Sequence, residues 1–199
     1  MILPSLPCRV HRAADNVRDS HFSIHLRPRL LMMIVLRLIH VLAGVFWAGA
    51  VFFTVSFLLP SMRDAGPAAQ AVSRQLMVVR KYPIKILSIA IVTVLSGLWL
   101  YAKDISMSNG TFGRSHAGRT YGIGAVAALA TLVVGFTMIT PSANRLGALG
   151  AAIQASGGPP TAEQQAEMAR LQARMTLGSR LAASLLLVTV ITMAVARYV

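Results

Sequence analysis

The sequence predicts an all-α integral membrane protein: an antiparallel bundle of four transmembrane helices, with a protruding helical hairpin between helices 3 and 4. Two observations lead to this prediction. Four long runs contain no charged side chain, and a helix of roughly 20 apolar residues is long enough to cross the hydrocarbon core of a bilayer. The composition agrees, because 55% of the residues are hydrophobic and only 13% are charged, well below the charged fraction of a typical soluble domain.

The transmembrane domain is expected to cover residues 30–199. Its spans are expected at about residues 33–60, 84–102, 120–142 and 178–198. The second and fourth apolar runs are short, but the lysines and arginines that flank them can extend their side chains to the membrane interface. An even number of spans places both termini on the same side of the membrane.

Residues 1–29 differ from the rest and are expected to be a flexible basic tail, or sequence translated from an early start codon. They contain five arginines, three histidines and three prolines, without an apolar period. No short apolar core precedes a small-residue cleavage site, so they are not a secretory signal. Cys8 is the only cysteine, which excludes an intrachain disulfide and a cysteine metal site.

The connections between the spans have distinct characters. Residues 64–83 are expected to form a short amphipathic helix at the headgroup level, and the polar, glycine-rich residues 103–119 are expected to form a loop. Residues 141–180 are expected to extend both neighbouring spans as a helical hairpin, broken at residues 157–160. The run Thr161-Ala-Glu-Gln then matches a capping box that starts the last helix.

The net charge of +13 does not indicate a nucleic-acid-binding protein. The basic residues are spread among the connections and helix ends, where membrane proteins face lipid headgroups, and no nucleic-acid-binding pattern is present. The first and third connections carry more lysine and arginine than the second. The positive-inside rule therefore predicts that both termini are periplasmic, in a bacterial inner membrane.

One face of the first span contains the candidate functional residues. Arg37, His40, Gly44 and Trp47 follow one another at spacings of three, four and three residues, which places them on one side of a helix. An ionisable residue inside a membrane is costly and is a functional candidate by default, so this face is expected to point into the bundle. Four residues of the other spans are expected at the same depth: Gly97, Tyr101, Tyr121 and Met193.

This combination suits haem b. The imidazole of His40 can ligate iron, the guanidinium of Arg37 can pair with a propionate, and the glycines can let a flat macrocycle approach the backbone. Met193 and His116 are the candidates for a second axial ligand.

Two alternatives remain open. His40 can instead donate a hydrogen bond to a backbone carbonyl, to Tyr101 or to Tyr121 and fix helix packing, as in a cofactor-free accessory subunit of a larger respiratory or photosynthetic complex. His40 can also bind copper(I) together with Met32 or Met33. A proton pump or coupled carrier is disfavoured, because none of the six acidic residues lies inside a span.

The first two spans resemble a known group of proteins. His40, six further residues, Trp47-Ala48-Gly49 and then Pro60, together with Gly97-Leu98-Trp99-Leu100, resemble the copper-resistance-D-like group of four-helix bacterial membrane proteins. They are also distantly similar to the haem-containing membrane protoporphyrinogen oxidases. The resemblance covers roughly residues 33–198.

The resemblance implies a haem-ligand position at His40. The oxidase family carries a lysine early in its third span, where this chain has Tyr121-Gly122-Ile123-Gly124. What the resemblance implies is therefore haem binding rather than porphyrinogen oxidation.

Overall fold

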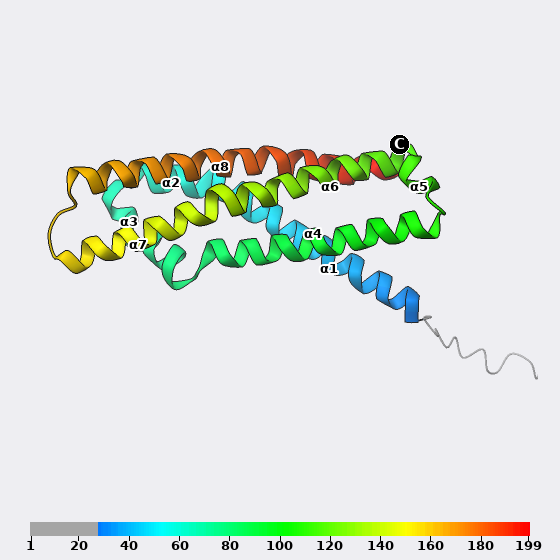
Figure 1. Cartoon of the computed structure of the whole chain (residues 1–199), viewed down its shortest axis with the longest axis horizontal. Coiled ribbons are helices and arrows are strands. Elements are labelled where there is room, and N and C mark those ends of the chain that lie inside the picture. The colour runs from blue at the N-terminus through cyan, green and yellow to red at the C-terminus, as the bar shows by residue number, and fades with distance from the viewer. Residues whose placement is uncertain (1–27) are drawn as a thin grey trace, which may run out of the picture.

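The computed structural model describes residues 28–199, and all the regular structure in this range is helical. The described residues form four long helical stretches, which lie lengthwise beside one another with shorter segments joining them (Figure 1). Of the expected tail, residues 1–27 lie outside the described residues, and the first helix begins at Pro28. The prediction of an all-helical chain is confirmed.

The first stretch is a continuous helix with one widened turn. Its parts are α1 (Pro28–Phe53), the π-helical turn η1 (Thr54–Leu58) and α2 (Leu59–Asp64). Pro60 lacks an N–H group, and its ring crowds the carbonyl four residues earlier. That carbonyl belongs to Ser56 and lies within the widened turn. A π-helical turn leaves more room around the carbonyl, and helices commonly accommodate a proline in this way.

The connection to the second stretch is helical, as the sequence predicts. It contains the short elements η2 (Gly66–Ala68), α3 (Ala69–Arg74) and η3 (Gln75–Val79). Leu76 is half-buried, whereas Val72 and Val79 are exposed. Lys81 then adopts a left-handed conformation with φ of 50° and turns the chain into α4 (Tyr82–Met107).

The prediction that residues 103–119 form a loop is wrong. α4 continues to Met107, α5 covers Thr111–Arg114, and α6 covers His116–Val134. The side chain of Ser115 accepts a hydrogen bond from the N–H of Gly118 and caps the start of α6. The polar residues that suggested a loop therefore include a helix cap, which is a favoured role for serine.

The third stretch repeats the widened turn of the first. α6 is followed by the π-helical turn η4 (Gly135–Ile139) and by α7 (Thr140–Ser156). Pro141 has no N–H to offer the carbonyl of Thr137, four residues earlier. Nη2 of Arg174 donates a hydrogen bond to that carbonyl at 2.9 Å, so a neighbouring helix supplies the donor that the proline lacks.

The fourth stretch contains one uninterrupted α-helix, α8 (Ala162–Val195), closed by the 3₁₀ turn η5 (Ala196–Tyr198). Its predicted capping box is confirmed. The Thr161 N–H donates to Oε1 of Gln164 at 2.9 Å, and the Gln164 N–H donates to Oγ1 of Thr161 at 3.2 Å. Residues 157–160 break the hairpin between α7 and α8 where the sequence predicts.

The helices associate mainly as two pairs. α1 packs chiefly on α4, and α6 packs chiefly on α8, with fewer contacts between α4 and α6 and between α1 and α8. A small core joins the pairs with side chains from all four long helices. Its buried members are Trp47, Ala90, Val94, Ala128 and Leu186.

The outside of the bundle is apolar. Four helical stretches are long and apolar enough to cross a membrane: Leu30–Asp64, Tyr82–Met107, His116–Ser156 and Ala162–Tyr198. Each expected span lies within one of them. In the most apolar part of the first stretch only 6% of residues are buried, against 22–28% in the other three. α1 is therefore the most peripheral helix, and its apolar residues face outward over much of its surface.

The two halves of the chain share a pattern. η1 and η4 each begin six residues before a proline that is followed by serine, Pro60-Ser61 and Pro141-Ser142. Thirteen residues before these prolines lie Trp47 and Ala128, both members of the buried core. The chain is thus built from two helical pairs, each of which begins with a helix of the same design.

Candidate functional site

His40 ties α1 to α4. Its Nδ1 lies 2.8 Å from the carbonyl oxygen of Thr93. A carbonyl can only accept a hydrogen bond, so Nδ1 carries the proton and donates it, an assignment that follows from the hydrogen-bond network. Oγ of Ser96 lies 3.3 Å from the same nitrogen. The second ring nitrogen, Nε2, makes no hydrogen bond to the described protein atoms.

Gly97 accommodates the imidazole. A Cβ atom built on Gly97 would lie 2.6 Å from Cε1 of His40 and 3.0 Å from its Nδ1. These distances are shorter than van der Waals contact, so no larger residue fits at position 97 while the ring keeps its place. The glycine that was expected to make room for a macrocycle makes room for the histidine.

The next residues of the predicted face, Gly44 and Trp47, belong to helix packing. A Cβ at Gly44 would lie 3.4 Å from the methyl group of Thr93, which is ordinary contact. Trp47 is 4% exposed and lies in the core. Arg37 is exposed, so the prediction that it points into the bundle with His40 is wrong.

Tyr101 and Tyr121 belong to an aromatic cluster at the junction of α4, α5 and α6. The hydroxyl of Tyr101 donates to the carbonyl of Gly118 at 3.0 Å and lies 3.3 Å from the place of a Cβ at Gly122. The ring of Phe112 lies between the two tyrosines, with centroids 6.0 Å from Tyr101 and 6.2 Å from Tyr121. The two tyrosines and Phe112 thus pack the segment that joins α4 to α6 against the ends of both helices.

Met193 lies in the other helix pair. A Cβ at Gly124 would lie 3.0 Å from Cε of Met193 and 2.5 Å from Oγ1 of Thr192. His40 contacts α4, whereas Met193 contacts α6, so the structure does not bring these two candidate ligands together through a shared contact.

The residues that sequence reasoning missed are hydroxyl side chains inside the long apolar helices. Thr93, Ser96 and Thr131 are buried, and each donates its hydroxyl to the carbonyl of the residue four earlier in its own helix. Thr189 also reaches the carbonyl of Gly124 at 3.4 Å. Their signal in the sequence is the presence of Ser and Thr within apolar runs, which does not reveal the facing helix.

The fit of haem to this site can be judged from the glycines. Gly97, Gly122 and Gly124 have no free space beside them, because His40, Tyr101 and Thr192 fill it. The free Nε2 of His40 is a suitable donor for iron, since a histidine ligand commonly donates its other ring N–H to a carbonyl. The donor therefore fits, whereas the glycine cradle expected for a macrocycle does not.

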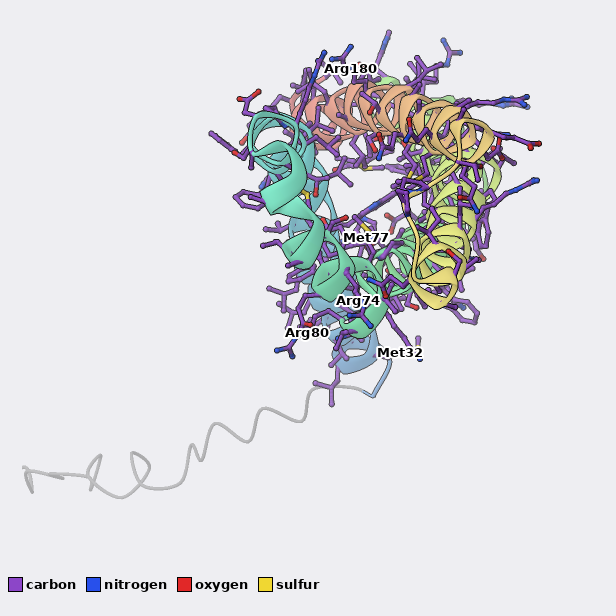
Figure 2. All side chains as sticks on the ribbon, turned by 90° about the vertical axis from the view of Figure 1, so that its left-hand side faces the viewer. Met32, Arg74, Met77, Arg80 and Arg180 are labelled. Carbon is purple, nitrogen blue, oxygen red and sulfur yellow. The ribbon has the colours of Figure 1, made fainter. Side chains whose placement is uncertain are left out.

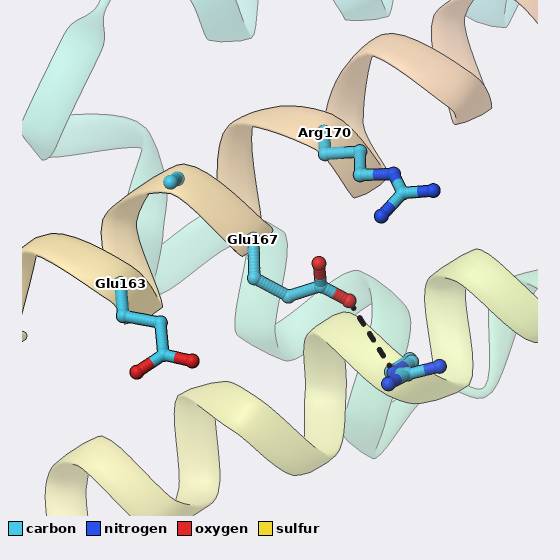
Figure 3. A pocket seen from close by; sticks show the side chains of 5 residues that line it. Glu163, Glu167 and Arg170 are labelled. Atoms are coloured by element: carbon cyan, nitrogen blue, oxygen red, sulfur yellow. Dashed lines mark ion pairs between the residues drawn. The ribbon is translucent and has the colours of Figure 1, made fainter.

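No group of three or more His, Cys, Asp or Glu side chains within residues 28–199 is placed to hold a metal ion. Two hollows lie elsewhere on the molecule. One, of about 220 Å³, is bordered by Trp99 and Lys103. The other, of about 430 Å³, lies between α7 and α8, where Arg145 pairs with Glu167 at 3.4 Å (Figure 3). This pair is partly exposed and contributes less than about 1 kcal/mol to stability.

Comparison of the chain with models of protein families, with curated proteins and with solved structures found no match.

Proposed function

We propose that this protein is a multi-pass protein of a bacterial inner membrane, with its four long helices spanning the bilayer as an antiparallel bundle. The proposal is supported by the length and apolarity of the four helices and by the outward exposure of their apolar side chains. A water-soluble bundle of this size would instead cover its outer faces with polar residues.

Within this bundle, we infer that His40 is an interhelical tie and that the protein serves as a cofactor-free accessory or structural subunit of a larger membrane complex. The observation that carries this inference is the position of the imidazole between the Thr93 carbonyl and Gly97. A buried polar group in a bundle strengthens the association of two helices when its hydrogen bond is made between them.

The test is an absorbance spectrum of the purified full-length protein, oxidised and reduced, combined with thermal unfolding. The inference predicts a colourless protein that migrates with a larger complex in mild detergent. His40→Ala is expected to lower the unfolding temperature, since one interhelical hydrogen bond contributes about 0.6 kcal/mol. His116→Ala is the matched control, because His116 is exposed, and is expected to leave the unfolding temperature unchanged.

Haem b bound through Nε2 of His40 is the second candidate, favoured by the hydrogen bond that fixes Nδ1 as the protonated nitrogen. It is also what the resemblance to the haem-containing oxidases implies. A Soret band that is present in the native protein and lost in His40→Ala would establish it and overturn the cofactor-free inference. Copper handling remains the third proposal, and would show as copper(I) binding without colour.

A further inference from the structure

We propose that the helical connection between α2 and α4, residues 66–81, is a binding surface for the headgroups of anionic phospholipids. This proposal rests on the proposed membrane insertion and adds a lipid specificity to it. The connection lies just beyond the apolar part of the first and second stretches, which places it at the headgroup level in an inserted bundle.

The first argument is the exposure of apolar side chains on this connection. Leu76 and Met77 are half-buried, and η3 packs against α4 and α7. Val72, Val78 and Val79 are nevertheless 57%, 51% and 58% exposed. These three valines lie outside the spans. In an inserted bundle they would therefore contact the boundary between the lipid headgroups and the acyl chains.

The second argument is charge. Arg74, Arg80 and Lys81 are exposed beside these valines, and Figure 2 shows Arg74 and Arg80 near each other at one end of the bundle, with Met77 closer to its middle. No carboxylate of the described residues pairs with them within 4 Å. Cations that have no carboxylate partner among residues 28–199 and lie beside exposed apolar side chains are the pattern that attracts a negatively charged membrane surface.

The third argument is the backbone. Lys81 has a φ of 50°, a conformation that costs a residue other than glycine about 1 kcal/mol. The left-handed corner ends the connection and starts α4, so the amphipathic segment can turn away from the helix axes. Strain of this kind commonly marks a functional segment.

The experiment uses the purified full-length protein in detergent and measures its unfolding temperature with added phosphatidylglycerol, phosphatidylcholine or inorganic phosphate. Phosphatidylglycerol is expected to raise the unfolding temperature by roughly 5 °C more than phosphatidylcholine, and less so at high salt. The combined variant Arg74→Gln/Arg80→Gln/Lys81→Gln is expected to lose this difference. Lys103→Gln/Arg114→Gln/Arg119→Gln, which removes the same charge from the α4–α6 connection, is expected to keep it.

The proposal would be overturned by equal stabilisation by both lipids or by an unchanged difference in the first variant. An equal loss in both variants would also overturn it, because it would indicate a general effect of net charge. Stabilisation by inorganic phosphate alone would also overturn it, because the site would then bind small anions. Membrane insertion is tested separately by retention of each variant in carbonate-washed membranes. A protein that is washed off contradicts the proposed function, whereas a retained protein without lipid preference contradicts only this inference.

Discussion

At the scale of single residues, His40 and Gly97 form the most specific contact between two helices. The imidazole reaches the Thr93 carbonyl only because position 97 carries no side chain. The pair explains why a histidine can lie inside an apolar helix pair at low cost, since its protonated nitrogen has a fixed acceptor.

Gly97→Ala is expected to destabilise the protein by about 1–3 kcal/mol, because the added methyl group overlaps the His40 ring and pushes it from its hydrogen bond. The measurement is thermal or denaturant unfolding in detergent. Gly49→Ala is the matched control: a Cβ there meets nothing within 4 Å, so this change should be neutral or slightly stabilising.

The same substitution made in a His40→Ala background gives a sharper test. Without the ring, the alanine at position 97 meets no imidazole, and its better helix propensity should make the change neutral or favourable. A penalty that stays the same in both backgrounds would show that Gly97 does not act through His40.

Lys81→Gly is expected to stabilise the protein by about 1 kcal/mol, because glycine adopts a φ of 50° without the cost that a Cβ imposes. The gain is partly offset by the greater freedom of glycine in the unfolded chain. Thermal unfolding measures it, with Lys85→Gly, within α4, as the control that should destabilise. A lower unfolding temperature for Lys81→Gly would contradict the left-handed backbone conformation of residue 81.

At the scale of elements, the widened turns before Pro60 and Pro141 set the form of the first and third stretches. In η4 the carbonyl of Thr137 lacks a donor from Pro141 and receives one from Arg174. The arginine therefore supplies a hydrogen-bond donor to the widened turn of a neighbouring stretch.

Arg174→Ala is expected to cost about 1 kcal/mol in the native background. In a Pro141→Ala background the cost should be smaller, because the alanine supplies an N–H within the helix. A double-mutant cycle by thermal unfolding measures the difference. An equal loss of unfolding free energy in the two backgrounds would mean that the hydrogen bond from Arg174 to Thr137 does not stabilise the widened turn.

The elements also show where the sequence was informative. The capping box at Thr161 was predictable because its pattern is local, and the apolar runs located all four long helices. The helical structure within residues 103–119 was not predictable in the same way. Glycine and serine are typical of loops in a sequence, but here Gly110 lies in a turn and Ser115 caps the start of α6.

At the scale of the whole molecule, the proposed insertion predicts which turns lie on each side of the membrane. The turn at Asn109, between α4 and α5, and the turn at Gly158, between α7 and α8, lie at opposite ends of the bundle (Figure 1) and should face the periplasm and the cytoplasm, respectively. In a Cys8→Ser background, Asn109→Cys is expected to react with a membrane-impermeant maleimide in intact cells. Gly158→Cys should react only after the cells are permeabilised, and labelling of both positions from outside would contradict the proposed topology.

The candidate site was only partly predictable at this scale. The spacing of His40, Gly44 and Trp47 located one face of α1, and a hydrogen bond from His40 to a backbone carbonyl was among the alternatives. The sequence could not show that Met193 and Tyr101 contact α6, because the pairing of helices depends on close packing between side chains that look alike in an apolar run.

The π-helical turns η1 and η4 have a consequence for the orientation of the helices that follow them. A turn of this kind closes its hydrogen bond one residue later than an α turn and so absorbs a single surplus residue. Removing one residue from η4 would therefore restore regular winding and leave the orientation of α7 nearly unchanged, whereas removing one residue from the start of α7 itself would rotate the rest of that helix by about 100°. Arg145 would keep its place opposite Glu167 after the first deletion and turn away from it after the second, so the widened turn takes up one extra amino acid without turning the far half of the stretch away from its neighbour.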